Sequence, residues 1–142
     1  MHDPGSTLKI ALTFLKFRPR TVFELTEKLK SKNISQEEID KTLEVLTRNK
    51  LLGDAEFAKM WVRDRNLFKP SGSFVLKLEL RKLGVSDEDI ETALENQDEE
   101  ALARKALESK SRYRNAEFNK QAQFLQRRGF NPGIIFKILK KN

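Results

Sequence analysis

Apolar residues along this chain recur three and four positions apart, in short segments that alternate with turn-forming residues. This spacing places the apolar side chains on one face of a helix, and segments of about 10–16 residues are of ordinary helix length. Helix starts are marked by Ser or Thr with Glu three residues later, as in Thr21 with Glu24 and Ser35 with Glu38. Beyond the first residues, proline and glycine fall between the predicted helices, at Pro19, Gly53, Pro70, Gly72, Gly84, Gly129, Pro132 and Gly133.

One segment, residues 74–80, is ambiguous when taken alone. Phe74, Leu76, Leu78 and Leu80 alternate with other residues, which fits a strand. Leu76, Leu80 and Leu83 also stand at the i, i+4, i+7 positions of a helix face. An internal repeat favours the helix.

The same pattern occurs three times, at offsets of 51 and then 45 residues. Each copy has a leucine near the end of one helix, a Gly or Asn turn, a capping residue and an Ile-x-x-x-Leu pair. The corresponding residues are Leu29, Leu80 and Leu125; Asn33, Gly84 and Gly129; Ile39, Ile90 and Ile135; and Leu43, Leu94 and Leu139. Glycine suits the left-handed position after a helix, and asparagine is its usual substitute. Phe17, Phe68 and Tyr113 also correspond, which predicts a place for each in the core of its unit.

The repeat predicts an elongated all-α fold, a tandem array of three three-helix units with nine helices in total. The segment at 74–80 belongs to a helix, because its counterpart at 21–32 carries strong helix signals. The predicted boundaries are a flexible leader at 1–7 and units at 8–52, 53–97 and 98–142.

The composition excludes several classes of function. The 142 residues include no cysteine and a single histidine, His2, so thiolate metal sites, cysteine nucleophiles and a Ser-His-Asp triad lack their residues. The sequence also has no glycine-rich phosphate loop. We therefore expect no enzyme, no catalytic residue, no metal and no cofactor. Because no apolar run approaches membrane-spanning length and the N-terminus lacks a signal pattern, we expect a soluble, cytoplasmic protein.

The positive charge of the chain, +7 in total, lies at its two ends. Residues 1–52 carry a net +3, residues 53–97 a net −2 and residues 98–142 a net +6. A basic surface fits a polyanion such as nucleic acid, or an acidic protein partner. A solvated helical surface would explain the same charges, so charge alone leaves nucleic-acid binding open.

Several conspicuous residues have structural explanations. Trp61 falls on one helix face with Phe57, Ala58 and Val62, which predicts core packing rather than base stacking. The acidic runs at 87–89 and 98–100 suit the first turn of a helix, where carboxylates complement the helix dipole, better than a metal site. The apolar stripe of the last segment, residues 134–139, predicts a docking face.

Four segments resemble the RecX family of bacterial recombinase regulators, in the family's order and spacing. They are residues 11–29, the stretch Leu51-Leu52-Gly53-Asp54 with Trp61-Val62-Arg63-Asp64-Arg65, Lys69-Pro70-Ser71-Gly72 leading to 78–85, and Phe124–Phe130. The resemblance covers nearly the whole chain from about residue 8. The chain departs from the family's pattern at three places. Asn33 replaces a glycine, and Gly53-Asp54 replaces an acidic pair. Residues 73–75 stand where the family often has a basic residue.

The resemblance implies a non-enzymatic modulator that lodges in the groove of a RecA–DNA filament and usually limits recombinase activity. The implied partners are the RecA filament and single- or double-stranded DNA, with no membrane, and the protein is expected to be a monomer. The basic residues we select as partner or DNA contacts are Arg18, Arg20, Arg63, Arg65, Lys69, Arg112, Arg127 and Arg128.

Two other classes of function stay open on the sequence. A sequence-independent nucleic-acid-binding helical module would use the same basic residues and bind bare DNA with a steep salt dependence. A structural adaptor would bind through an apolar groove between units and would tolerate loss of the basic residues.

Overall fold

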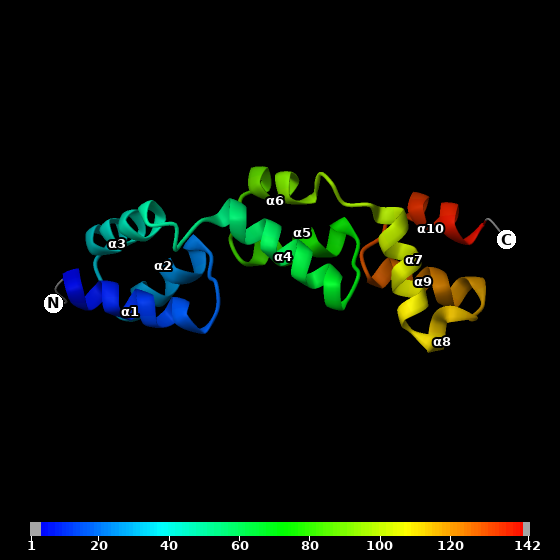
Figure 1. Ribbon diagram of the computed structural model, residues 1–142, viewed down its shortest axis with the longest axis horizontal. Helices are drawn as coiled ribbons and strands as arrows, with labels where there is room; N and C mark the ends of the chain where they lie inside the picture. Colours follow the sequence, from blue (N-terminus) through cyan, green and yellow to red (C-terminus); the bar gives the residue numbers. More distant parts are fainter. Residues whose placement is uncertain (1–3, 141–142) are drawn as a thin grey trace.

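The computed structural model describes residues 4–140, and within them the chain forms ten α-helices in three groups. The three groups lie in a row, with α1 at one end and α10 at the other (Figure 1). The elongated all-helical array predicted from the repeat is therefore confirmed.

Each unit is a set of consecutive helices joined by short turns. Unit 1 contains α1 (Pro4–Phe17), α2 (Val22–Ser31) and α3 (Gln36–Arg48). Unit 2 contains α4 (Asp54–Phe68), α5 (Ser73–Lys82) and α6 (Asp87–Leu94). Unit 3 contains α7 (Glu99–Ser109), α8 (Ser111–Arg114), α9 (Phe118–Arg127) and α10 (Pro132–Leu139).

The helix α8 is the element that the sequence did not predict, and it raises the number of helices among residues 4–140 from nine to ten. It is a single turn with no apolar periodicity of its own. Its one aromatic residue, Tyr113, stacks on Phe124 of α9 with ring centroids 4.2 Å apart. The turn therefore forms because Tyr113 packs against α9.

Each unit has its own apolar core. The repeat-equivalent leucines Leu29, Leu80 and Leu125 are fully buried, as predicted. The three cores consist of α1–α3 residues around Leu25 and Ile39, α4–α6 residues around Leu76 and Ile90, and α7–α10 residues around Phe124 and Phe130. Each core lies within one unit, so each copy of the sequence repeat corresponds to one helical unit with its own core.

The helix boundaries follow the predicted caps and turns. Thr21 and Glu24 form a complete capping box at the start of α2. The turn residues Asn33, Gly84 and Gly129 have left-handed φ values of 61°, 84° and 91°. The ambiguous segment at 74–80 lies inside α5, where Leu76 and Leu80 are buried.

The first helix begins earlier than the predicted leader allows. Helix α1 starts at Pro4, a residue type suited to the first helical position. Thr7 is fully buried, and its Oγ1 donates a hydrogen bond to the Glu38 carboxylate at 3.2 Å. Residues 1–3 of the predicted leader lie outside the described residues.

The predicted core position of Phe17 and Phe68 is wrong. Their exposed fractions are 78% and 87%, whereas their counterpart Tyr113 is half-buried against Phe124. Phe17 and Phe68 are the last residues of α1 and α4, beyond the turns that face the cores. Tyr113 differs because α8 folds back onto α9.

Successive units meet at a contact that we call a joint. In the joint between units 1 and 2, Thr21 Oγ1 donates to the Leu83 carbonyl at 2.6 Å, and the Val22 N–H donates to Asp54 Oδ1 at 2.9 Å. In the joint between units 2 and 3, the Gly72 N–H donates to the Arg128 carbonyl at 2.7 Å. The Ser73 N–H there donates to Glu99 Oε1 at 3.0 Å.

The two joints are built from equivalent positions of the repeat. The start of the second helix of one unit donates to the turn before the last helix of the next unit. The first helical N–H also donates to a carboxylate at the start of that next unit's first helix. The repeat therefore specifies how units stack as well as how each unit folds.

The joint between units 1 and 2 predicts a pH dependence centred on Asp54. Burial raises the pKa of its carboxyl above the ordinary 3.8, and the charges of Asp89 and Glu24 add to this. The hydrogen bond from Val22 opposes the rise without cancelling it. A carboxyl with a raised folded-state pKa binds its proton more tightly in the folded state, so it stabilises the fold increasingly as pH falls through that pKa.

We therefore expect the wild-type protein to gain free energy of unfolding relative to Asp54→Asn as the pH falls from neutral toward 4. The asparagine amide oxygen keeps the acceptor for the Val22 N–H, which makes this the matched variant. Urea unfolding of both proteins at several pH values measures the difference. A wild-type protein that instead lost stability relative to Asp54→Asn on acidification would contradict the raised pKa.

Candidate functional site

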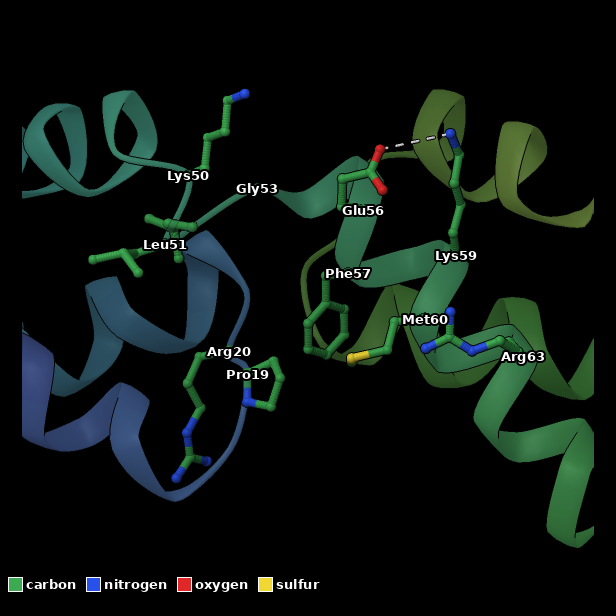
Figure 2. Close-up of a pocket in the computed structure, with 11 residues that line it drawn as sticks. Pro19, Arg20, Lys50, Leu51, Gly53, Glu56, Phe57, Lys59, Met60 and Arg63 are labelled. Atoms are coloured by element: carbon green, nitrogen blue, oxygen red, sulfur yellow. Dashed lines mark ion pairs between the residues drawn. The ribbon is translucent and has the colours of Figure 1, made fainter.

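A cleft opens at the boundary between units 1 and 2, with a cavity volume of about 320 Å³. Its walls come from the loop before α2, the connection between α3 and α4, and one face of α4 (Figure 2). The residues that line it are Pro19, Arg20, Lys50, Leu51, Leu52, Gly53, Glu56, Phe57, Lys59, Met60 and Arg63. We call it the junction cleft.

Helical spacing brings the α4 residues of the cleft together. Glu56, Lys59, Met60 and Arg63 stand at i, i+3, i+4 and i+7, which share one face of a helix. Lys59 pairs with Glu56 at 3.7 Å, and both side chains are largely exposed. Exposed pairs of this kind contribute only about 0–1 kcal/mol, so Lys59 can exchange its partner at little cost.

Lys50 lies at the rim of the cleft and has a left-handed backbone conformation. Its φ is 59°, and the turn around it is closed by the Leu51 N–H donating to the Leu46 carbonyl at 2.9 Å. A lysine in this conformation costs about 1–2 kcal/mol relative to a helical one. Among the described residues Lys50 has no ion-pair partner. The turn thus holds an uncompensated cation at the rim of the cleft.

Arg20 forms the opposite wall. Its guanidinium lies over the Phe14 ring, 3.9 Å from the centroid, and its Nε donates to the Phe14 carbonyl at 3.4 Å. Burial lowers the pKa of Arg20, and the neighbouring Arg18 adds to the effect. Because arginine keeps its proton far above neutral pH, Arg20 stays charged there.

The junction cleft is therefore electropositive. It contains four cationic side chains and one carboxylate, that of Glu56. Such a concavity attracts anions, either carboxylates or phosphates, because the cations of its walls act together on one region of solvent.

A second concavity, the junction notch, adjoins the cleft. Its volume is about 260 Å³, and it shares Pro19, Phe57 and Met60 with the cleft. The remaining lining residues are Arg18, Trp61, Asp64, Arg65 and Phe68. The notch is mostly apolar, in contrast to the cleft beside it.

The eight basic residues selected from the sequence fall into different places. Arg20 and Arg63 line the cleft, and Arg18 and Arg65 line the notch. Lys69 is exposed directly after α4. Arg112, Arg127 and Arg128 belong to unit 3, at the far end of the row from unit 1 (Figure 1).

Among these arginines, Arg65 connects two helices of unit 2. Arg65 donates two hydrogen bonds to Glu79, at 2.9 and 2.7 Å, and Trp61 Nε1 donates to the same carboxylate at 2.8 Å. Burial alone would raise the pKa of Glu79, but these hydrogen bonds and the charge of Arg65 together lower it. Arg65 thus connects α4 to α5.

Arg128 is only 7% exposed and belongs to the joint between units 2 and 3. Its guanidinium donates to the Pro70 carbonyl at 2.7 Å and lies over the Phe124 ring at 4.8 Å. Burial lowers its pKa, and the charge of Arg65 adds to this. Its side chain stabilises the joint and is not exposed to a partner in this arrangement.

Sequence reasoning missed Lys50 and Lys59, which line the cleft. Lys59 could have been found from its i, i+4 spacing to Arg63, a residue already selected. Lys50 carried no such signal, because its place at the rim of the cleft depends on the turn between α3 and α4.

No group of three or more His, Cys, Asp or Glu side chains within residues 4–140 is placed to hold a metal ion. Over the same residues, no helix combines the length and apolar character needed to cross a bilayer.

Comparison with known proteins identifies the family. Sequence models of the first, second and third three-helix domains of RecX match residues 8–46, 54–94 and 98–139. The protein named Regulatory protein RecX of Thermotoga maritima is 35% identical over 135 residues, covering 94% of this chain and 83% of that protein. The protein of the same name from Geobacillus sp. (strain WCH70) is 35% identical over 91% of this chain and 51% of its own length. The chain thus spans about half the length of some curated relatives that it matches.

A solved structure agrees with the sequence matches. The crystal structure of RecX from Lactobacillus salivarius has a TM-score of 0.82 and 29% sequence identity, and the match covers 97% of this chain and 95% of that one. With all three domain types present in order and a relative aligned over most of both lengths, the chain belongs to the RecX family of regulatory proteins.

Proposed function

We propose that this chain regulates a RecA recombinase by binding the RecA–DNA filament and lowering its ATP hydrolysis and strand exchange. The observation that carries the proposal is the junction cleft, which places four cations at an exposed boundary of a RecX-family array. The protein acts by binding, without catalysis of its own. We place this activity in the cytoplasm and assign it to the monomer.

The shape of the array supports a filament as the partner. The three units lie in a row (Figure 1), and an array of this kind can contact several protomers of a filament at once. Contacts made by one rigid chain to neighbouring protomers raise each other's effective concentration. A partner that repeats along an axis therefore suits an elongated array better than a single compact protein does.

The proposal predicts that reversing two cleft charges, in the double variant Lys59→Glu with Arg63→Glu, weakens inhibition of RecA. We expect the concentration needed for half-inhibition to rise about tenfold or more, which corresponds to ~1.4 kcal/mol or more. RecA ATPase and strand-exchange assays, titrated with each protein, measure this. Circular dichroism should be unchanged, because both side chains are exposed.

A matched control is the double variant Lys30→Glu with Lys41→Glu in unit 1. These lysines are also exposed and also pair with a carboxylate of their own helix, and the net charge changes equally. Inhibition equal to wild type is expected. Equal loss in both double variants would mean that overall charge, and not the cleft, governs the effect.

The wild-type protein and the two double variants also test the alternative function, a sequence-independent nucleic-acid-binding module. It predicts equal affinity for bare DNA and for the RecA–DNA filament, with a steep salt dependence in both. Filament regulation predicts tighter binding to the filament. An absence of any effect on RecA turnover at saturating protein would overturn the proposed function.

A further inference from the structure

The junction cleft and the junction notch form one groove with two unlike halves. They share Pro19, Phe57 and Met60, so the two concavities adjoin. The cleft follows the first half of α4, around Glu56 to Arg63, and the notch follows its second half, to Phe68. We call the two together the junction groove.

The notch half offers hydrocarbon surface and few free polar groups. Phe57 stacks on Trp61 with centroids 5.8 Å apart, and the Trp61 N–H is already donated to Glu79. Phe68 closes the outer edge with 87% of its surface exposed. Leaving so large an apolar ring in water forgoes the stabilisation that burial would provide. A large aliphatic or aromatic side chain placed in the notch would cover it.

The cleft half offers positive charge. Arg20, Lys50, Lys59 and Arg63 line it, against the single carboxylate of Glu56. In Figure 2 the charged ends of Lys50 and Arg20 point to opposite sides, and Lys59 points to Glu56. The exposed ion pairs of Lys59 with Glu56 and of Arg63 with Asp64 are weak, so carboxylates of a partner can replace Glu56 and Asp64. The chemistry that complements the groove is therefore one large apolar side chain next to a run of acidic residues.

The arrangement favours a peptide over a single-stranded nucleic acid. Nucleic-acid grooves alternate phosphate-binding cations with exposed aromatic faces on which bases stack. Here the aromatic ring that lines the cleft, Phe57, is only 4% exposed, and Trp61 lies against one of its faces. The exposed ring, Phe68, lies at the opposite end of the groove. The two arginines that line the notch with that ring, Arg18 and Arg65, are already paired with Glu24 and Glu79, so a phosphate next to a stacked base would find these cations occupied.

The length of the groove sets the length of its ligand. From Glu56 to Phe68, α4 rises about 18 Å at ~1.5 Å per residue. An extended peptide advances about 3.3 Å per residue, so about five or six residues span the groove. We propose that the junction groove binds an acidic, extended peptide segment of the partner protein, with one large apolar side chain seated in the notch and its carboxylates in the cleft. This inference rests on the proposed function, because it specifies which kind of recombinase segment binds at the same site.

The test uses fluorescence anisotropy with the full chain. The probes are a labelled peptide of Asp and Glu residues around one central Phe, the same peptide with Ala in place of Phe, and labelled oligothymidylate of equal charge. We expect the Phe peptide to bind about tenfold more tightly than the Ala peptide. Phe68→Ala should abolish that preference, while Lys59→Glu with Arg63→Glu should weaken both peptides.

Phe68→Ala is also expected to fold as the wild type does, since its side chain is 87% exposed, and urea unfolding checks this. The exposed Phe17→Ala, at the equivalent position of unit 1 and outside the groove, is the matched control and should retain the preference. Equal binding of the two peptides, or tighter binding of oligothymidylate at the same salt concentration, would overturn the inference.

Failure of this inference is distinguishable from failure of the proposed function. Loss of RecA inhibition in the Lys59→Glu, Arg63→Glu variant, together with no preference for the Phe peptide, would retain the function and reject the peptide ligand. The peptide preference together with no effect of the wild-type protein on RecA would retain the ligand chemistry and reject RecA as the partner.

Discussion

Replacing Leu80 with alanine is expected to lower the free energy of unfolding by about 2–5 kcal/mol. The Leu80 side chain is fully buried in the core of unit 2, where it packs with Phe57, Leu76 and Ile90. Truncation removes the transfer free energy of the lost methyl groups and leaves a cavity that neighbouring helices fill only in part. Urea unfolding followed by circular dichroism measures the loss.

The same helix provides the control. Leu78 lies on α5 two residues before Leu80, and 48% of its surface is exposed. Leu78→Ala should change the free energy of unfolding by about 0.5 kcal/mol or less. If Leu80→Ala were as neutral as Leu78→Ala, the repeat alignment that makes Leu29, Leu80 and Leu125 equivalent would lose its physical meaning.

Replacing Gly72 with alanine is expected to break the joint between units 2 and 3. A Cβ atom at position 72 would overlap the backbone carbonyl of Gly129 and lie 2.5 Å from the amide nitrogen of Phe130. Backbone atoms cannot move aside by changing a rotamer, so the two units would have to separate. Overpacking of this kind costs about 1–3 kcal/mol, and losing the Gly72 hydrogen bond to Arg128 adds about 1 kcal/mol.

The backbone conformation of Gly72 shows that the expected loss is steric. Its φ of −78° is open to every residue, so alanine brings no backbone strain there. Urea unfolding gives the loss of stability, and small-angle scattering reports whether units 2 and 3 change their relative position. Gly53→Ala is the control, because Gly53 has no neighbour within 4 Å of a Cβ and has an extended φ of 179°. Equal stability of Gly72→Ala and Gly53→Ala would contradict the close joint.

The joints connect the fold to the proposed function. Both use the start of a unit's second helix as donor and the next unit as acceptor, so each unit is added with the same contacts. The junction groove lies beside the first of these joints and draws its walls from both units. A change that separated units 1 and 2 would therefore disperse the groove without unfolding either core.

The sequence alone determined the local structure and the repeat. Apolar spacing, the Thr21 and Ser35 caps and the turns at Gly84 and Gly129 act within a few residues, so their helices and boundaries could be predicted. The offsets of 51 and 45 residues then gave three units in tandem. The same information could not predict α8, because that turn depends on Tyr113 packing against a helix formed later in the chain.

Only the tertiary structure decided which predicted residues face solvent and which face the protein. Phe17 and Phe68 match Tyr113 in the repeat, yet they lie past the last core-facing turn of their helices and stay exposed. Arg65 and Arg128 read as surface cations, yet one bonds to Glu79 and the other closes a joint. Lys50 lies at the rim of the cleft because of a left-handed turn that no spacing rule indicates. The physical reason is that helix formation depends on neighbours in sequence, whereas burial and charge pairing depend on which surfaces meet when the units stack.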